Sequence, residues 1–404
     1  MNKSILNEKV RLKYLAHVEM GQSPPSAEYS SSLGQGLPFL QGTADFGKIN
    51  PVPSVFCESP TKIAAKGDIL FSVRAPVGEL NLADQEIGIG RGLCAIRPSN
   101  LWNIRFGWWA LHEARNNLNY VSTGSTYEAV SVEDVANLLV ETTGMAEQRS
   151  IADYLDRETV RLDALITAKE RLLELLAEKR RALITRAIVH GLDSNVPLRD
   201  SGVSWLGEIP VHWKTERSRW LFQERDERSI TGEEELMTVS HLTGVTPRSE
   251  KDVNMFEAET TEGYKICLTG DLVINTLWAW MGAMGVSPMN GIVSPAYNVY
   301  QPGKKLESSY VDLLVRLPVF VQEITRYSKG VWSSRLRLYP EGFFEASLPV
   351  PPISEQKEIA AYIAKETAKF DRLSSVTESS ITLLKERRAA LISAVVTGSS
   401  KLEA

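Results

Sequence analysis

Two stretches of the chain place apolar residues at helical spacing and contain neither glycine nor proline. They run from Met145 to His190 and from Glu355 to Thr397, and both are rich in Ala, Leu, Glu, Lys and Arg. Their apolar stripes comprise Leu162, Leu165, Ile166, Leu172, Leu173, Leu175, Leu176 and Leu183 in the first stretch, and Phe370, Leu373, Ile381, Leu383, Leu384 and Leu391 in the second. Because neither stripe can remain in water, we predict an antiparallel helix pair with approximate twofold symmetry.

The ends of both predicted helices carry stop and start signals. Gly191 and Gly398 stand where a left-handed C-terminal cap would lie. The second helix follows three prolines, and we expect Ser354 to be its N-cap, with Glu355 in the first turn, where the helix dipole favours a carboxylate.

The chain also repeats itself. Glu147-Gln148, Ile151-Ala152 and Tyr154 return 208 positions later as Glu355-Gln356, Ile359-Ala360 and Tyr362. The same offset joins Thr159 to Thr367, Asp163 to Asp371 and Arg180 to Arg388, and a weaker copy upstream relates Gly67-Asp68 to Gly270-Asp271. Since a period near 200 residues is far longer than that of a solenoid, we infer a duplicated domain, each copy followed by a helix.

The remaining sequence predicts two α+β domains with twisted, mostly antiparallel sheets. Short β-prone runs are separated by Gly, Pro, Asn and Asp, and they lie at 69–73, 93–96, 236–239, 272–276 and 297–300. A helix is expected after the strands of each half, at 103–120 and at 308–327. The predicted domains are 1–144 and 213–352, the helical regions 145–191 and 353–404, and the linker 192–212.

Composition and charge limit the classes of function. A chain of 404 residues, 43% hydrophobic and 24% charged, is long enough for two or three domains with separate cores. A net charge of -5 argues against gripping nucleic acid by bulk electrostatics alone, although residues 315–340 carry a local excess of four positive charges. This pattern suits a subunit whose partners supply much of the grip on DNA.

The cysteines and the apolar runs indicate neither a disulfide framework, nor a metal site, nor a membrane segment. Cys57, Cys94 and Cys267 are far apart, so we expect partly buried structural thiols rather than a disulfide framework or a metal site. No signal-peptide core and no run of membrane-spanning length occurs, so we expect a cytoplasmic protein with no membrane partner.

The repeated Glu-Gln-x-x-Ile-Ala-x-Tyr helix start, the Leu-Pro-Val-Pro-Pro lead-in at 348–352, the helix end at 391–398 and the segment 200–213 together resemble the specificity subunits of type I restriction-modification systems. The resemblance covers essentially the whole chain. It implies two similar α/β target recognition domains separated by a pair of long antiparallel coiled-coil helices. Each domain would read one half of a bipartite, asymmetric DNA target, and the helices would set the spacing.

The resemblance also implies partners. Two methyltransferase (modification) subunits would dock on the helices and domains, two restriction subunits would complete the assembly, and double-stranded DNA would be the substrate. No cofactor is expected on this chain, while S-adenosylmethionine, ATP and Mg²⁺ would be used by the partner subunits. The chain itself would be a non-catalytic reader.

Candidate DNA contacts combine forked donors with small hydroxyl residues on loops. In the first half they are Gln41, Thr43, Arg74, Thr123, Ser125, Thr126 and Tyr127, and in the second His241, Thr243, Lys329, Trp332, Ser333, Ser334, Arg335 and Arg337. The alternative for any of them is an ordinary solvated loop. Trp278 and Trp280 are instead expected in the core, because large aromatic residues are mostly buried.

Two other classes of function were weighed. An enzyme is disfavoured because the chain lacks an (Asn/Asp)-Pro-Pro-(Tyr/Phe) motif, a P-loop and an HExxH motif, and we expect Gly88–Gly92 to be a hairpin rather than a cofactor loop. Glu355-Gln356-Lys357 resembles part of a nuclease site, but its copy is Glu147-Gln148-Arg149, so the constant element is the helix start. A non-catalytic coiled-coil assembly adaptor without DNA specificity remains the alternative; it accounts for the helices but not for the divergent globular halves.

Overall fold

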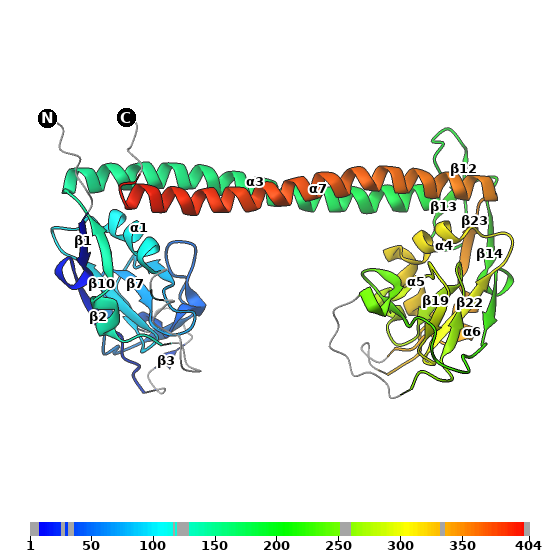
Figure 1. Cartoon of the computed structure of the whole chain (residues 1–404), viewed down its shortest axis with the longest axis horizontal. Coiled ribbons are helices and arrows are strands. Elements are labelled where there is room, and N and C mark those ends of the chain that lie inside the picture. The colour runs from blue at the N-terminus through cyan, green and yellow to red at the C-terminus, as the bar shows by residue number, and fades with distance from the viewer. Residues whose placement is uncertain are drawn as a thin grey trace. The chain divides into compact units, whose positions relative to one another are not determined.

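The structure is a computed structural model, and it describes residues 8–25, 29–30, 36–115, 118, 129–250, 260–331 and 336–399. The chain divides into two compact units: unit 1 comprises Met1–Glu170 and Ser379–Ala404, and unit 2 comprises Arg171–Glu378. The division crosses both long helices, α3 (Met145–His190) and α7 (Ile353–Val396). Each unit therefore joins a globular α/β part to a section of each helix (Figure 1).

The two long helices pair in antiparallel fashion within each unit, as predicted. In unit 1 Asp163 accepts a hydrogen bond from Arg388 at 2.9 Å and Glu170 lies 3.3 Å from Lys385, so residue numbers rise along α3 while they fall along α7. In unit 2 Arg180 lies 3.3 Å from Asp371. These two Arg–Asp pairs occupy equivalent positions of the internal repeat.

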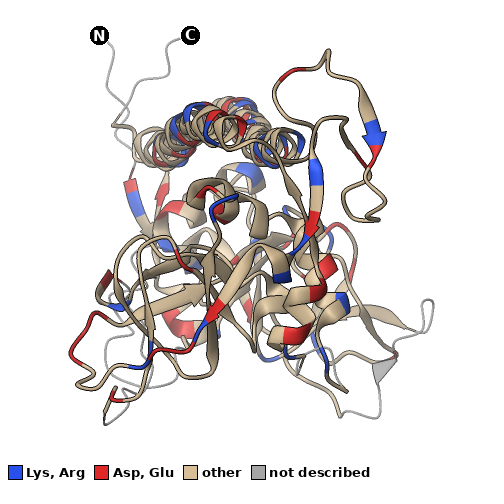
Figure 2. Cartoon of the chain, turned by 90° about the vertical axis from the view of Figure 1, so that its right-hand side faces the viewer, with Lys and Arg blue, Asp and Glu red and all other residues tan. Residues whose placement is uncertain are grey.

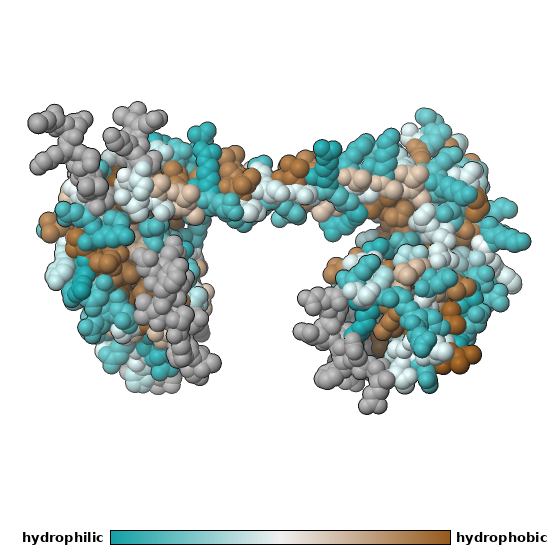
Figure 3. All heavy atoms as spheres, viewed as in Figure 1, coloured by the Kyte–Doolittle hydropathy of each residue, from teal (hydrophilic) through white to brown (hydrophobic). Residues whose placement is uncertain are grey.

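The buried seam of the helix pair is narrower than the sequence indicated. Buried positions follow one another at intervals of three and four residues, and they include Leu155, Thr159, Leu162 and Ile166 on α3 and Ile363, Thr367 and Ile381 on α7. Leu165, Leu172, Leu175, Leu373 and Leu383, predicted to be in the stripe, are 38–64% exposed. A two-helix pair covers only two positions per heptad, so the flanking leucines stay at the surface, where Figure 3 shows apolar residues along the helices.

The helix ends partly agree with the prediction. Gly191 and Gly398 adopt φ of +75° and +72°, the left-handed conformation expected of C-terminal caps. The N-cap prediction for Ser354 is wrong, because α7 already begins at Ile353, directly after Pro352, and Ser354 lies inside the first turn. Proline's fixed φ suits the residue that enters a helix, so the start shifts toward it.

A buried glutamine explains the repeated helix start. Gln356 accepts a hydrogen bond from the Glu307 backbone N–H at 2.9 Å and donates to the carbonyls of Lys305 and Pro351, both at 2.8 Å. Gln148 does the same in unit 1, accepting from Asn103 N–H at 2.6 Å and donating to the carbonyls of Leu101 and Thr143 at 3.0 and 2.7 Å. Each side chain thus joins the start of a long helix to the loop before a shorter one, a structural role.

Each unit contains a four-stranded antiparallel sheet with the same strand order. In unit 1 the order is β2-β10-β7-β8, and in unit 2 it is β15-β22-β19-β20. Their bounds are β2 Ala16–Met20, β10 Leu93–Pro98, β7 Ile69–Ser72 and β8 Leu80–Leu82, and β15 Phe222–Arg225, β22 Tyr297–Pro302, β19 Leu272–Asn275 and β20 Met284–Val286. The identical order confirms the duplication that the sequence predicted.

Two-strand ribbons lead from the globular parts into the long helices. β1 (Glu8–Arg11) pairs with β11 (Leu139–Thr142) before α3, and β14 (Lys214–Arg217) pairs with β23 (Ser347–Val350) before α7. A second hairpin in unit 2, β12 (Leu198–Asp200) and β13 (Glu208–Pro210), lies in the segment expected to be a linker. Its neighbours Leu206 and Trp213 are buried in the core of unit 2, so this segment is part of that unit's packing.

The second sheet layer differs between the units. In unit 1 it has five strands in the order β3-β5-β4-β9-β6, and β4 and β9 are parallel. In unit 2 it consists of two pairs, β16 with β17 and β18 with β21. The bounds are β3 Tyr29–Ser30, β4 Leu37–Leu40, β5 Val55–Cys57, β6 Ile63–Ala64 and β9 Ile87–Ile89, and β16 Met237–Ser240, β17 Gly244–Pro247, β18 Lys265–Cys267 and β21 Gly291–Val293. The predicted hairpin at Gly88–Gly92 is wrong, because β9 pairs with β4 and β6 while β10 belongs to the other sheet.

In each unit one short helix lies between the four-stranded sheet and the long helices. Tyr310 and Leu314 of α4 (Ser308–Val315) share a core with Ile274 of β19, Ile188 of α3 and Ile359 of α7 (Figure 1). In unit 1, α1 (Ile104–Ala114) occupies the equivalent place, capped by Asn103. The single helix predicted at 308–327 is instead two, α4 and α5 (Pro318–Tyr327), because Pro318 cannot continue a helix and starts a new one. The helix predicted at 103–120 ends at Ala114, and 116–117 and 119–120 lie outside the described residues.

The remaining short elements are α2 (Val132–Ala136), α6 (Pro340–Glu345) and the 3₁₀ turns η1 (Leu12–Tyr14), η3 (Thr43–Asp45), η5 (Ser218–Trp220), η6 (Arg248–Glu250) and η7 (Ala279–Met281). The three cysteines are free and fully buried rather than partly buried as expected, and burial raises the pKa of the Cys94 thiol to about 12. In the part of the chain that the structure describes, no helix has the length and apolar character needed to span a membrane.

We expect Gln356→Ala to lower the free energy of unfolding of unit 2 by about 2–3 kcal/mol, because it leaves one buried N–H and two buried carbonyls without partners. Chemical denaturation, with hydrogen exchange assigning the transition to unit 2, measures this loss. Gln322→Ala is the matched control, since Gln322 is exposed on α5. Equal losses for the two variants would contradict the role given to the buried amide.

Candidate nucleic-acid interface

The structure brings two predicted DNA contacts together in unit 2. Lys329 N–H donates to the Arg337 carbonyl at 2.8 Å, and Arg337 N–H donates to the Lys329 carbonyl at 2.9 Å. Both side chains are exposed, so two cations stand at the base of the loop that they close. Trp332, Ser333, Ser334 and Arg335, predicted at its tip, lie outside the described residues.

This loop returns to the end of a central strand, and unit 1 has an equivalent arrangement. Leu338 N–H donates to the carbonyl of Thr276, just after β19, at 3.0 Å. In unit 1 Val130 N–H donates to the carbonyl of Val73, just after β7, at 2.9 Å. The backbone of Arg74 forms an isolated antiparallel β-bridge with that of Ala129. Thr123, Ser125, Thr126 and Tyr127 fall in a segment outside the described residues. Equivalent strand ends therefore carry the two predicted reading loops.

The other predicted loops follow β4 and β16, and each of these segments has a parallel pairing in its unit, Phe39 with Gly88 and Leu236 with Ile292. Gln41 is exposed and donates to the Ser23 hydroxyl at 2.7 Å, while Thr43 is half-buried in η3. His241 and Thr243 are exposed, and Arg316 donates from Nη2 to the Leu242 carbonyl between them at 2.8 Å. These placements leave all four side chains accessible to a partner, and their contacts with DNA stay a prediction.

The expectation that Trp278 is a core residue is wrong. Trp278 is 48% exposed and directly precedes η7, close in sequence to Thr276 where the reading loop is anchored. Trp280 is half-buried, and its indole N–H donates to the Leu277 carbonyl at 3.0 Å. The short 3₁₀ turn that follows Trp278 was not predicted from the sequence, and it leaves the Trp278 side chain toward solvent instead of in the core.

Acidic and basic residues are interspersed along the chain (Figure 2), and the buried carboxylates of Asp68 and Asp271 have structural partners. Asp68 pairs with Arg97 at 2.7 Å and accepts from the Ala65 N–H, and Asp271 pairs with Arg225 at 2.8 Å and accepts from the Leu268 N–H. The hydrogen bond to Asp68 raises the pKa of Arg97. The repeated Gly-Asp motif therefore fixes a turn before β7 and β19. Among the described residues, no group of three His, Cys, Asp or Glu side chains could hold a metal ion.

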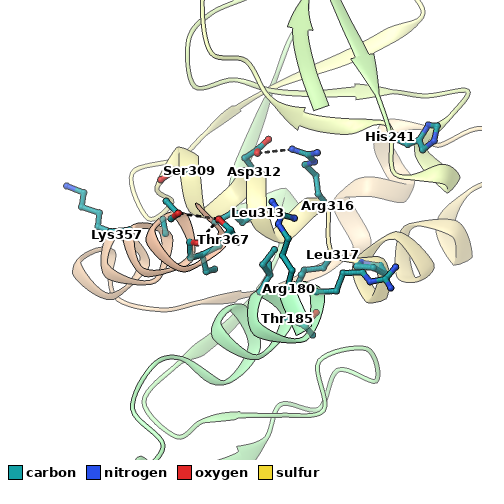
Figure 4. A pocket seen from close by; sticks show the side chains of 17 residues that line it. Arg180, Thr185, His241, Ser309, Asp312, Leu313, Arg316, Leu317, Lys357 and Thr367 are labelled. Carbon is teal, nitrogen blue, oxygen red and sulfur yellow. Dashed lines mark hydrogen bonds and ion pairs between the residues drawn. The ribbon is translucent and has the colours of Figure 1, made fainter. Parts of the chain in front are cut away.

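Sequence reasoning missed a cavity between the long helices and the globular part of each unit. The cavity of unit 2 has a volume of about 750 Å³ and includes Arg180, Arg181, Arg316 and His241 in its lining (Figure 4). The cavity of unit 1 has a volume of about 780 Å³ and includes Arg388, Trp108, Trp109 and His112. Arg180 and Arg388 occupy equivalent positions of the repeat. The cavities could not be predicted from a local sequence pattern, because they depend on how α1 or α4 packs.

The cavity of unit 1 is aromatic. The His112 ring lies 5.1 Å from the Trp108 ring and 5.8 Å from the Trp109 ring, and the Trp109 N–H donates to Asp156 at 2.8 Å. Burial, with the positive charges of Arg115 and Arg388 nearby, lowers the pKa of His112 to about 3. This histidine is therefore neutral near pH 7.

The low pKa of His112 predicts an acid-sensitive unit 1. Its folded-state pKa of about 3 lies below the ordinary value of 6.5, so the stability it contributes is complete above pH 6.5. As pH falls from 6.5 toward 3, only the unfolded state takes up the proton, and stability is lost at up to about 1.4 kcal/mol per pH unit. We expect His112→Gln to remove this part of the slope in denaturation at several pH values. His17→Gln, at an exposed site of unit 1, should keep the wild-type slope, and an unchanged slope in His112→Gln would refute the assignment.

Comparison with known proteins gives a family match for the first part of the chain. Residues 6–175 match the family model of the type I restriction modification DNA specificity domain. A protein of Methanocaldococcus jannaschii, named a type I restriction enzyme MjaX specificity subunit, is 35% identical over 167 residues. That alignment covers 41% of this chain and 38% of the relative, so it spans less than half of the relative's length.

Two solved structures share the fold at 16% sequence identity. One comes from work on complex assembly and conformational transition of the type I R-M system, with a TM-score of 0.75 over 98% of both chains. The other is the HsdS subunit from Thermoanaerobacter tengcongensis, with a TM-score of 0.56 over 98% of this chain and 97% of that one. The family model matches the first half, and unit 2 repeats the strand order and helix start of that half. Residues 6–175 therefore match the type I restriction modification DNA specificity domain, and the whole chain shares the fold of the two solved structures.

Proposed function

We propose that this chain is the non-catalytic subunit that gives a type I restriction-modification complex its DNA sequence specificity. Each unit reads one half of a bipartite, asymmetric target in double-stranded DNA. Two methyltransferase subunits bind the chain, and two restriction subunits complete the assembly. S-adenosylmethionine, ATP and Mg²⁺ act in those partner subunits, and the complex works in the cytoplasm, where its DNA substrate lies.

One observation carries this proposal: equivalent strand ends hold loops of different sequence. The loop bases are fixed by the same backbone hydrogen bonds, to the carbonyl of Val73 in unit 1 and of Thr276 in unit 2. The β-bridges beside these bonds join different residues, Arg74 with Ala129 in unit 1 and Lys329 with Arg337 in unit 2. A common scaffold with divergent loop chemistry is what two readers of different base sequences require.

The exposed apolar residues of the long helices support the docking of two identical partners. Leu165 and Leu373 are 45% and 46% exposed, and Leu175 and Leu383 are 40% and 64% exposed, each pair separated by the repeat offset. Apolar residues exposed in both copies suit a partner that binds twice. An assembly adaptor without DNA specificity would use the same helix surface, but it gives no reason for cationic loop bases at equivalent strand ends.

We expect Arg337→Gln to change or relax one half of the methylated sequence and to leave the other half unchanged, because Arg337 belongs to one unit. Loss of a base contact corresponds to about 1–3 kcal/mol of discrimination at that position. Long-read mapping of adenine methylation, in a host that carries the chain with its methyltransferase, gives the readout.

Arg74→Gln should affect the opposite half-site, and Lys304→Gln, an exposed cation of unit 2 outside the loop, should affect neither. The proposal fails if both arginine variants methylate the wild-type sequence with wild-type efficiency, or if the wild-type complex methylates no specific sequence.

The helix pair yields a separate expectation about spacing. Four residues inserted after both Ala168 and Val376, which are equivalent positions, add about 6 Å to each helix, or roughly two base pairs of DNA. The mapped half-sites should keep their sequences and move apart. Insertion of four residues after Asn195, in an exposed turn, is the control. Altered half-site sequences with unaltered spacing would contradict the role of the helices.

A further inference from the structure

The cavity of unit 2 has an excess of positive charge that its surroundings do not compensate. Arg180 comes from α3, and its Nε lies 3.3 Å from Asp371, while Arg316 of α4's C-terminus lies 3.5 Å from Asp312. Arg181, which also lines the cavity, has no ion-pair partner among the described residues. Three arginines therefore face two carboxylates, which leaves one positive charge.

Arg180 also has a spare donor. Its Nε is buried and makes no hydrogen bond within the described part of the chain, because its approach to Asp371 lacks the geometry of one. A buried guanidinium N–H without an acceptor is costly, so a ligand oxygen there would be stabilising. In Figure 4 Arg180 and Arg316 extend into the cavity from different elements, whereas Lys357 points away from it.

The equivalent cavity of unit 1 serves as an internal comparison. Its four cations are matched by four carboxylates: Arg388 and Lys48 pair with Asp163, Arg105 pairs with Asp153 and Asp156, and Arg115 pairs with Glu79. The position and the repeated arginine are the same, but the charge is balanced. An excess confined to unit 2 is thus a property of this site and not of the scaffold.

We propose that the unit 2 cavity binds a phosphodiester group of the DNA backbone, next to the bases that the adjacent loop reads. A phosphodiester carries one negative charge, which matches the uncompensated charge, and guanidinium groups bind phosphate oxygens through paired donors. His241, in the loop after β16, lines the cavity, and Arg316 donates to the carbonyl of Leu242 in the same loop. The cavity therefore lies beside a predicted DNA contact, which favours DNA over a protein carboxylate as the occupant. This inference rests on the proposed DNA-reading function and adds a sequence-independent contact to it.

The test is the salt dependence of DNA binding by the full chain, measured by fluorescence anisotropy with a labelled duplex of arbitrary sequence. Arg181→Gln should weaken binding and reduce the slope of log K against log[salt] by about 1, the signature of one lost phosphate contact. Arg181→Lys should keep most of the slope. Arg372→Gln, the same charge change at an exposed position of α7 in unit 2, should behave as wild type.

The outcomes separate the two proposals. A wild-type chain that binds no duplex, either alone or in complex with its methyltransferase subunit, refutes the DNA-reading function itself. A wild-type chain that binds, with Arg181→Gln and Arg372→Gln giving the same slope, overturns only the phosphate site. Arg181→Gln with the wild-type slope but reduced co-elution with the methyltransferase subunit would assign the cavity to a protein carboxylate, and this also overturns it.

Discussion

The buried seam between α3 and α7 is the constraint on which the other parts of both units depend. Its residues occur three and four apart, and the equivalent members Leu155 and Ile363, and Thr159 and Thr367, are buried alike. A seam this narrow fixes the rotation of each helix about its own axis. The helix faces that meet α1 and α4, and those left in water, follow from it. The two repeated Arg–Asp pairs flank the seam and add charge selectivity to an otherwise apolar contact.

The globular parts are attached to the long helices through a buried polar residue in each unit, rather than through apolar contacts alone. Gln148 and Gln356 are fully buried, and each has both its acceptor and its donor group satisfied by backbone from two different segments. Such a bond network has one geometry, whereas an apolar contact tolerates sliding. The orientation of α1 and α4 against the long helices is therefore set by hydrogen bonds, and both cavities owe their shape to it.

The sequence predicted those features that repeat or that follow a strict period. Helix length, antiparallel pairing, the duplicated sheet and the glycine caps at Gly191 and Gly398 all depend on local propensity or on the internal copy. Two helix predictions were wrong because a single proline overrode the helical periodicity. Pro318 divides the helix predicted at 308–327, and Pro352 shifts the start of α7 to Ile353. The exposure of Trp278 and the cavities could not be predicted, because they depend on how separate elements pack and on a 3₁₀ turn without a sequence signal.

Comparison of the two units within this one chain distinguishes residues with a shared role from residues whose role is specific to one unit. Features present in both copies, such as the glutamine bridges, the Asp68 and Asp271 turns and the helix leucines, serve needs that both halves share: folding and, under the proposed function, the docking of a partner that binds twice. Features present in one copy serve needs that differ. The uncompensated Arg181 of unit 2 and the aromatic rings around His112 of unit 1 belong to this second group. The proposed reading of an asymmetric DNA target requires this division, because the two half-sites differ in base sequence, so the halves of a reader diverge where they meet bases.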